Sequence, residues 1–271
     1  MIKLDLNLLS QRKKLRLKNR FFMFDSIFDK YSEYYDLLYD DKDYLAETNY
    51  VQKLISRHKS ECKNILEFGS GTGQHGSILA NLGYKVHGIE LSKEMCLKSK
   101  SVPGFTYQQG DISNIKMNKK YDTVISLFHV MSYQISNKKI NDVFANAANH
   151  LDKGGLFIFD FWYSPAVYTL KPSIRVKRKS NKKIEITRIA EPMIYSTQNK
   201  VDVKYTIFLK NLSDNSKIEF QETHPVRHFS LLELDLYSER NGFKRVDQEE
   251  FMTGLEINDN TWGPCVVLKK I

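Results

Sequence analysis

The chain has 271 residues, of which 41% are hydrophobic and 27% are charged, so it can bury the core of one large domain or of one domain with an insertion. No apolar run approaches the ~20 residues of a membrane-spanning helix, and three widely separated cysteines argue against a disulfide framework or a zinc site. The formal charge of +9 invites a nucleic-acid partner.

The positive charge is concentrated in two runs, Q-R-K-K-L-R-L-K-N-R at 11–20 and I-R-V-K-R-K-S-N-K-K at 174–183. We expect the first run to belong to a solvated basic extension over residues 1–24. The second alternates with apolar residues, which predicts a solvent-facing edge strand. The charge also suits a substrate that carries phosphates, so it does not by itself decide the partner.

In chain order, helical spacing of apolar and aromatic residues first predicts helices over 25–40 and 45–58. Short apolar runs then predict strands that alternate with helices. The strands are expected at 64–68, 84–91, 104–109, 121–128 and 154–161, and the helices at 74–82, 92–100 and 137–151. Nearly continuous apolar strands between helices predict a parallel sheet covered on both faces, in doubly wound order.

After residue 162 the hydrophobic period changes to two, which predicts antiparallel strands. These strands are expected at 183–188, 201–209 and 217–224, followed by a helix at 231–241 and closing strands at 243–247 and 265–270. We therefore expect an α/β fold with a Rossmann-like seven-stranded sheet in the order 3-2-1-4-5-7-6. An antiparallel β insertion after strand 5 is expected to form a lid over the active site.

The predicted domain organisation follows from this change of pattern. Residues 1–24 form the basic extension, residues 25–162 and 231–271 form the cofactor-binding domain, and residues 163–230 form the substrate-binding insertion.

A glycine-rich loop, I-L-E-F-G-S-G-T-G-Q-H-G at 65–76, follows the first strand of the predicted sheet. Glycine allows the sharp turn and the close approach of a ligand to backbone N–H groups. The letters fit both the dinucleotide pattern G-x-G-x-x-G from Gly71 and the pattern E-x-G-x-G-x-G from Glu67. The loop alone therefore leaves a pyrophosphate and the aminoacyl tail of S-adenosylmethionine equally open.

The residues after the next strands separate the two cofactors. Glu90 ends the second strand, where a carboxylate can accept hydrogen bonds from both ribose hydroxyls of either cofactor. Asp111 and Ile112 follow the third strand, where they suit an adenine amino group and ring. The fourth strand runs into Phe128 and His129 at the same edge. Asp122, by contrast, is expected to brace the start of that strand.

In this order, the loop, Glu90, Gly110-Asp111 and the segment 122–129 resemble the class I S-adenosylmethionine-dependent methyltransferases. The segments 28–44, 127–133, 159–167 and 224–230 resemble the small-molecule branch of that superfamily. They look most like the nucleotide-linked aminosugar N,N-dimethyltransferases and relatives of glycine N-methyltransferase. The likeness covers about residues 25–270 and is looser in the acceptor half. There, His129 and Val130 replace small residues, and Tyr133 stands where an active-site histidine is expected.

The resemblance implies S-adenosyl-L-methionine as cofactor and assigns roles to individual residues. The implied cofactor residues are Tyr35, Glu67, Gly69, Ser70, Gly71, Glu90, Leu91, Asp111, Ile112 and Phe128, with Glu67 orienting the ammonium group. The implied substrate residues are Tyr39, Trp162, Tyr163 and Arg227, and the catalytic candidates are Tyr133, His129 and His224. His75 is expected on the surface of its helix or against the cofactor, and no metal is expected.

The implied reaction is methyl transfer to the amine of a nucleotide-linked aminosugar or a related glycan precursor. Methylation of a hydroxyl on a sugar or phosphorylated small molecule stays open, because His129 or His224 could act as the base that it needs. RNA methylation and a catalytically silent subunit are further alternatives, although no N-P-P-Y-like tetrapeptide follows the fourth strand. We expect a cytoplasmic monomer or homodimer without a membrane span that acts on a small molecule rather than on nucleic acid.

Overall fold

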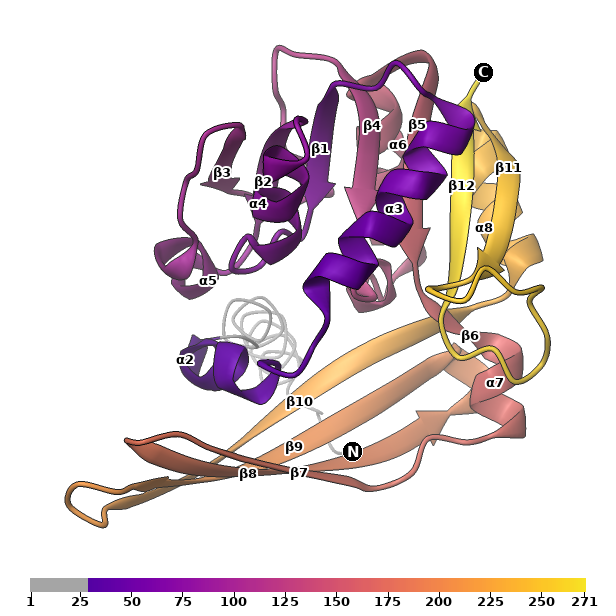
Figure 1. Cartoon of the computed structure of the whole chain (residues 1–271). Coiled ribbons are helices and arrows are strands. Elements are labelled where there is room, and N and C mark those ends of the chain that lie inside the picture. The colour runs from indigo at the N-terminus through magenta and orange to yellow at the C-terminus, as the bar shows by residue number, and fades with distance from the viewer. Residues whose placement is uncertain (1–28) are drawn as a thin grey trace, which may run out of the picture.

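The computed structural model describes the backbone of residues 29–271, and their side chains from residue 34 onward. The basic extension predicted for residues 1–24 lies outside the described residues. The chain forms a larger, central sheet and a second sheet that lies beneath the carboxyl ends of the central strands (Figure 1). Among residues 29–271, no helix combines the length and the apolar character needed to cross a membrane.

The central sheet has the predicted strand order, β3-β2-β1-β4-β5-β12-β11. Its strands are β1 (Asn64–Phe68), β2 (Lys85–Glu90), β3 (Phe105–Gln109), β4 (Tyr121–Ser126), β5 (Leu151–Asp160), β11 (Phe243–Glu250) and β12 (Pro264–Lys270). β1 to β5 run parallel, whereas β12 runs antiparallel to both of its neighbours. The doubly wound fold is thereby confirmed.

Helices cover both faces of this sheet and bury one apolar core on each side. They are α3 (Tyr44–His58), α4 (Gln74–Asn81), α5 (Lys93–Lys98), α6 (Asn137–Asn149) and α8 (Leu231–Arg240). Leu54 of α3 and Leu79 of α4 belong to one core, and Phe144 of α6 and Leu234 of α8 belong to the other. The predicted cap at Ser92 is confirmed, because its hydroxyl accepts the backbone N–H of Met95. Serine caps also begin α6 and α8.

The fourth strand ends earlier than the apolar pattern predicts. β4 stops at Ser126, because Phe128 and His129 take the left-handed region with φ of +64° and +61°. Residues with a Cβ rarely adopt this region. A short 3-10 helix, η1 (Val130–Tyr133), follows and returns the chain to the sheet edge. At the other end of β4, Asp122 accepts the backbone N–H groups of Lys63 and Asn64, so its predicted bracing role is confirmed.

The second sheet has the order β6-β10-β9-β8-β7. Its strands are β6 (Trp162–Tyr163), β7 (Arg175–Ser180), β8 (Ile184–Tyr195), β9 (Lys200–Asn211) and β10 (Lys217–Phe229), and α7 (Ser164–Thr169) and η2 (Ser196–Gln198) lie between them. β8, β9 and β10 are longer than their alternating patterns predict, because pairing between neighbours extends each strand. β7 is an edge strand, as the basic run at 174–183 predicts.

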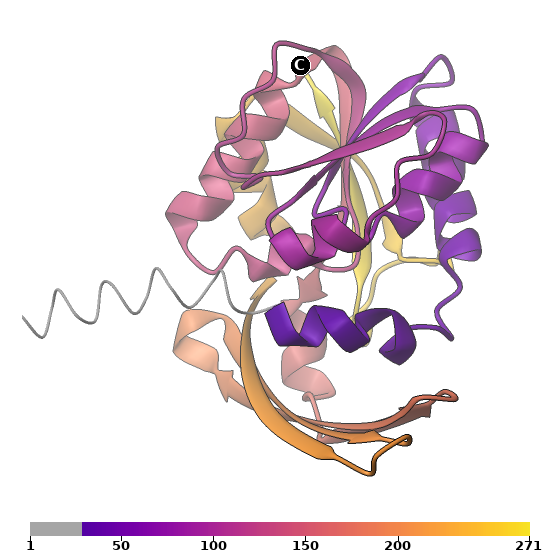
Figure 2. The ribbon, with the colours of Figure 1, turned by 90° about the vertical axis from the view of Figure 1, so that its left-hand side faces the viewer.

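Helix α2 (Asp29–Leu38) lies between the lower edge of the central sheet and the curved second sheet (Figure 2). Its Leu38 is fully buried and packs with Ile186, Ile207 and Leu209 of the second sheet. The residues after this helix are tied to the edge strand, since Lys177 pairs with Asp41 at 2.8 Å. The N-terminal part of the described chain therefore joins the two sheets.

Candidate active site

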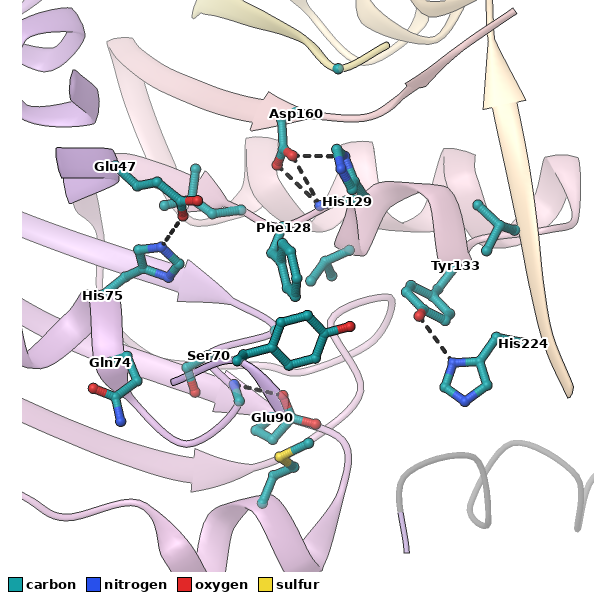
Figure 3. A pocket seen from close by; sticks show the side chains of 18 of the residues that line it. Glu47, Ser70, Gln74, His75, Glu90, Phe128, His129, Tyr133, Asp160 and His224 are labelled. Carbon is teal, nitrogen blue, oxygen red and sulfur yellow. Dashed lines mark hydrogen bonds and ion pairs between the residues drawn. The ribbon is translucent and has the colours of Figure 1, made fainter. Parts of the chain in front are cut away.

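A cavity of about 720 Å³ opens at the carboxyl ends of the central strands and is lined from both sheets (Figure 3). This volume suits a small-molecule ligand. Most of the residues that the sequence singled out line it. They are Tyr35, Tyr39, Gly69, Ser70, Gly71, Glu90, Leu91, Asp111, Ile112, Phe128, His129, Tyr133, Trp162 and His224. Glu67, Tyr163 and Arg227 are not on the cavity wall.

The glycine loop packs so tightly against η1 that one position excludes any side chain. Gly69 has φ of +72°, and a Cβ built on it would lie 2.5 Å from Val130 Cγ2. Gly71 also has a positive φ, +55°, but no atom lies within 4 Å of its Cβ position. The loop therefore turns sharply at Gly69 and exposes its backbone to the cavity at Gly71.

Glu90 holds this loop from the end of β2. One carboxylate oxygen accepts the backbone N–H of Gly71 at 2.9 Å, and the other accepts that of Ser92 at 2.8 Å. Burial raises the pKa of Glu90, although these backbone donors oppose the rise. The carboxylate is thus fixed on the cavity wall, with lone pairs left to accept hydroxyl groups.

Asp111 is held at the next strand end. Its Oδ1 accepts the backbone N–H of Ser113 at 2.8 Å, and its Oδ2 lies 3.2 Å from Lys139 Nζ. Burial alone would raise the pKa of Asp111, but the Ser113 donors and the Lys139 charge bring it below its ordinary value. Ile112 beside it is buried, and Leu91 across the cavity wall is 38% exposed. An ionised carboxylate and two aliphatic groups therefore border one end of the cavity.

Glu67 lies behind the loop rather than on the cavity wall. It is 1% exposed, and a Cβ on Gly76 of α4 would lie 2.6 Å from its Oε2. Burial, together with repulsion from Glu90, raises the pKa of Glu67 to about 8. The Glu67 carboxyl is therefore buried beside α4 and does not line the cavity.

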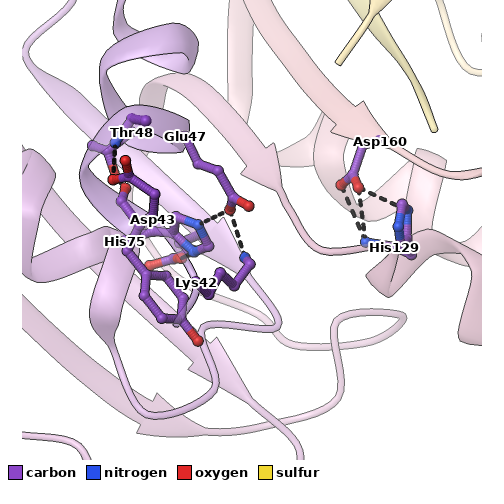
Figure 4. Close-up of polar contacts among 10 residues, drawn as sticks. Lys42, Asp43, Glu47, Thr48, His75, His129 and Asp160 are labelled. Atoms are coloured by element: carbon purple, nitrogen blue, oxygen red, sulfur yellow. Dashed lines mark hydrogen bonds and ion pairs between the residues drawn. The ribbon is translucent and has the colours of Figure 1, made fainter. Parts of the chain in front are cut away.

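His75 is buried rather than exposed on its helix, and it lines the cavity. Its Nε2 lies 2.8 Å from Glu47 Oε2 of α3, and Lys42 pairs with the same carboxylate (Figure 4). Lys42 also lies 3.9 Å from the centre of the Phe128 ring. Sequence reasoning did not identify Glu47 or Lys42, because no motif marks either residue and both lie about 30 positions from the histidine.

On the opposite side, η1 meets the second sheet through a tyrosine and a histidine. The Tyr133 hydroxyl lies 3.1 Å from His224 Nδ1 (Figure 3). On the other side of the ring, His224 Nε2 lies 3.3 Å from Glu222. Burial lowers the pKa of His224, although Glu222 opposes this, so the neutral ring is favoured. The rings of Trp162 and Trp262 stack at 5.5 Å and both line the cavity. This side is aromatic and suits a flat or sugar-like surface.

Arg227 and Tyr163 pack behind this wall. Arg227 is 8% exposed and donates to Glu233 and to the carbonyl of Ile135. Tyr163 packs edge-on against Phe161. The Arg227 guanidinium is therefore paired with Glu233 and does not line the cavity.

His129 stands at the end of β4 and contacts Asp160, the last residue of β5. Its backbone N–H lies 3.1 Å from both carboxylate oxygens of Asp160. Its Nδ1 lies 2.8 Å from Oδ2, at ion-pair distance but outside the geometry of an aligned hydrogen bond. Sequence reasoning missed Asp160, although its position after a parallel strand at the ligand-bearing edge could have revealed it.

Comparison with known proteins agrees with this geometry. Residues 65–155 match a family model described as a methyltransferase domain. The chain is 26% identical over 204 residues to a dTDP-3-amino-3,4,6-trideoxy-alpha-D-glucopyranose N,N-dimethyltransferase from Streptomyces venezuelae, covering 74% of this chain and 80% of the relative. It is 23% identical to a dTDP-4-amino-2,3,4,6-tetradeoxy-D-glucose N,N-dimethyltransferase from Saccharopolyspora spinosa, covering 65% and 72%.

Solved structures share the fold. DesVI from Streptomyces venezuelae superposes with a TM-score of 0.76 at 21% identity, covering 89% of this chain and 98% of that one. The sugar N-methyltransferase KedS8 from Streptoalloteichus superposes with a TM-score of 0.75 at 18% identity, covering 88% and 93%. The methyltransferase class expected from the resemblance is confirmed, and one of the structures that share the fold, CalS10, was solved with S-adenosylmethionine bound.

Proposed function

We propose that this S-adenosylmethionine-dependent methyltransferase acts on the amine of a nucleotide-linked aminosugar or a related glycan precursor. The observation that carries the proposal is the single cavity that joins a cofactor-type wall to an aromatic wall from the second sheet. Support comes from two relatives that are named for methylating dTDP-linked aminosugars. By their names, both relatives add two methyl groups to the same nitrogen, and we propose that this protein does the same.

The cofactor would lie across the ends of β1, β2 and β3. We assign the ribose hydroxyls to Glu90 and the adenine to Asp111, Leu91 and Ile112. The backbone of Gly69, Ser70 and Gly71 would carry the aminoacyl part, and Tyr35 and Phe128 would cover it. Glu67 would not touch the ammonium group directly. Its carboxyl would orient that group indirectly, by way of the glycine loop.

The acceptor would occupy the side nearer the second sheet. Tyr39 and Trp162 offer aromatic surface to a sugar or a base, and Tyr133 and His224 offer polar atoms that can orient it. Tyr163 and Arg227 would support this wall from behind. We propose that residues 163–230 act as the acceptor-binding insertion and close the cavity as a lid.

The chemistry asks little of the protein beyond alignment. Bound in this cavity, S-adenosylmethionine would supply an electrophilic methyl group to the amine lone pair, and its sulfur would keep the electron pair of the broken carbon–sulfur bond as neutral S-adenosylhomocysteine. Holding donor and acceptor in line in a dry cavity supplies most of the rate. An amine needs only its lone pair free for the transfer itself, so that step requires no strong base.

The proposal is tested by incubating the protein with S-adenosylmethionine and a panel of dTDP-linked aminosugars, each beside the matching sugar with a hydroxyl in place of the amine. We expect S-adenosylhomocysteine to form with at least one aminosugar and not with its hydroxyl partner. Turnover of the hydroxyl partner alone would replace the proposal with O-methylation. Turnover of RNA alone would point to the second enzyme class that the charge leaves open.

A further inference from the structure

Three histidines line the cavity, and they differ in what faces their ring nitrogens. His224 has Tyr133 on one nitrogen and Glu222 on the other. His75 has Glu47 at 2.8 Å on one nitrogen and Glu67 at 4.0 Å on the other. His129 has Asp160 on Nδ1, and among the side chains described from residue 34 onward none makes a hydrogen bond or ion pair with its Nε2. His129 therefore offers a ring nitrogen to the cavity.

The backbone at His129 is held in a costly shape. Phe128 and His129 are consecutive left-handed residues with side chains, and such positions are strained. Both oxygens of Asp160 accept the His129 backbone N–H, which secures this turn. Gly263 leaves room for the ring, since a Cβ there would lie 3.1 Å from His129 Cε1. The left-handed backbone, the Asp160 contact and the space left by Gly263 thus together set the position of the His129 ring.

His129 and Asp160 come from the ends of adjacent parallel strands, β4 and β5. Glu90 ends β2, on the other side of β1. A ligand in such a sheet lies across the point where the strand order reverses, which here is between β1 and β4. With the nucleoside on the β2 side, the transferable methyl group and the acceptor fall on the side of His129.

Asp160 is fully buried, and its surroundings keep it charged. Burial alone would raise its pKa, but His129 and, more weakly, Lys42 bring the pKa of Asp160 below its ordinary value. A buried carboxylate beside Nδ1 favours the tautomer with the proton on Nδ1. The lone pair of Nε2 is then directed away from Asp160 and is available as a proton acceptor.

We propose that His129 accepts the proton that the acceptor nitrogen loses after the first methyl transfer, and that Asp160 is the positioning residue that holds it for this step. The inference rests on the proposed amine acceptor. The first transfer forms a secondary ammonium group. That group gives one proton to His129 Nε2, which becomes an imidazolium, and the nitrogen regains its lone pair. The imidazolium releases its proton to solvent. After S-adenosylhomocysteine is exchanged for a second S-adenosylmethionine, the second transfer would form a tertiary ammonium group.

The experiment compares the wild-type protein with Asp160→Asn and His129→Asn in single-turnover and multiple-turnover assays. Asparagine tolerates the left-handed backbone at 129, and an amide at 160 can donate to Nδ1 and shift the ring proton to Nε2. We expect the second methyl transfer to slow about 100-fold, the scale of one lost proton acceptor. The first transfer should change much less, so the monomethyl product accumulates in both variants.

Nitrogen NMR of the imidazole gives a readout that does not depend on the acceptor. We expect the Nδ1–H tautomer of His129 in the wild-type protein and its loss in Asp160→Asn. Gly263→Ala, which crowds the ring without removing it, should give an intermediate mono- to dimethyl ratio. Asp122→Asn is the matched control, because Asp122 of β4 also accepts backbone N–H groups, those of Lys63 and Asn64, but lies outside the cavity.

The outcomes distinguish a failure of the proposed function from a failure of the proposed role of His129. If the wild-type protein methylates no aminosugar, the proposed function fails, and the NMR tautomer still decides whether Asp160 positions His129. If the wild-type protein makes the dimethyl product and both variants keep its mono- to dimethyl ratio, the inference is overturned while the proposed function stands. An unchanged tautomer in Asp160→Asn would also overturn it.

Discussion

The cofactor side and the acceptor side of the cavity are held together by different means. On the proposed cofactor side, Glu90 and Asp111 are fixed by backbone N–H groups from residues two positions further along the chain and from the loop after β1. On the acceptor side, side chains far apart in sequence hold one another, as Tyr133 and His224 do across 91 residues. Backbone contacts change little with sequence, whereas side-chain contacts change with each substitution. The acceptor side is thus the part of the cavity that can diverge.

The largest effect is expected at Glu90, where the backbone frame and the proposed ribose contact meet. Glu90→Gln should weaken S-adenosylmethionine binding about 100-fold, since two charge-assisted hydrogen bonds of roughly 1.5 kcal/mol each are weakened. Titration calorimetry measures this affinity, with Asp122→Asn as the control for general damage to β4. Unchanged affinity in Glu90→Gln would remove the proposed ribose contact.

Gly69 tests the contact between the two sides. Gly69→Ala places a methyl group 2.5 Å from Val130 and requires alanine to adopt φ of +72°, so we expect a loss of about 3 kcal/mol in unfolding free energy. Adding Val130→Gly should recover the steric part and leave the backbone strain. Thermal and urea unfolding of the single and double variants measure this. If the double variant loses as much unfolding free energy as the two single variants lose in sum, the two residues are not coupled.

Substitution of Glu67 tests how this buried carboxyl changes the unfolding free energy with pH. Its pKa rises from 4.5 to about 8 on folding, so the stabilising contribution is fully present below pH 4.5 and is lost as pH rises through 8. Relative to Glu67→Gln, the wild-type protein should lose roughly 2–3 kcal/mol between pH 6 and pH 9. Urea unfolding at several pH values provides the measurement. Parallel pH curves for the two proteins would mean that Glu67 does not titrate in this range.

The smallest effect is expected at Tyr133. Tyr133→Phe keeps the ring and removes the hydroxyl that contacts His224, so one buried hydrogen bond of about 1 kcal/mol is lost. We expect kcat/KM for the acceptor to fall about fivefold and S-adenosylmethionine affinity to stay the same. Steady-state kinetics with calorimetry distinguish the two. A variant that lost cofactor affinity instead would mean that the two sides are not separable.

Much of the fold could be predicted because it follows from local pattern. Apolar strands alternating with helices gave the strand order, and the glycines of 69–73, Glu90 and Asp111 fall at the ends of consecutive parallel strands. These positions share one sheet edge in any doubly wound fold. The loop, the nucleoside side of the cavity and the serine caps were therefore set by residues close together in the chain.

The tertiary structure alone decided the rest. Asp160 beside His129, Glu47 beside His75 and Glu222 beside His224 come from strand and helix packing that no local period encodes. Packing also placed Arg227 against Glu233, off the cavity wall. The physical reason is that a side-chain ion pair depends on the relative placement of two elements to within about one ångström, whereas a strand end depends only on its own residues.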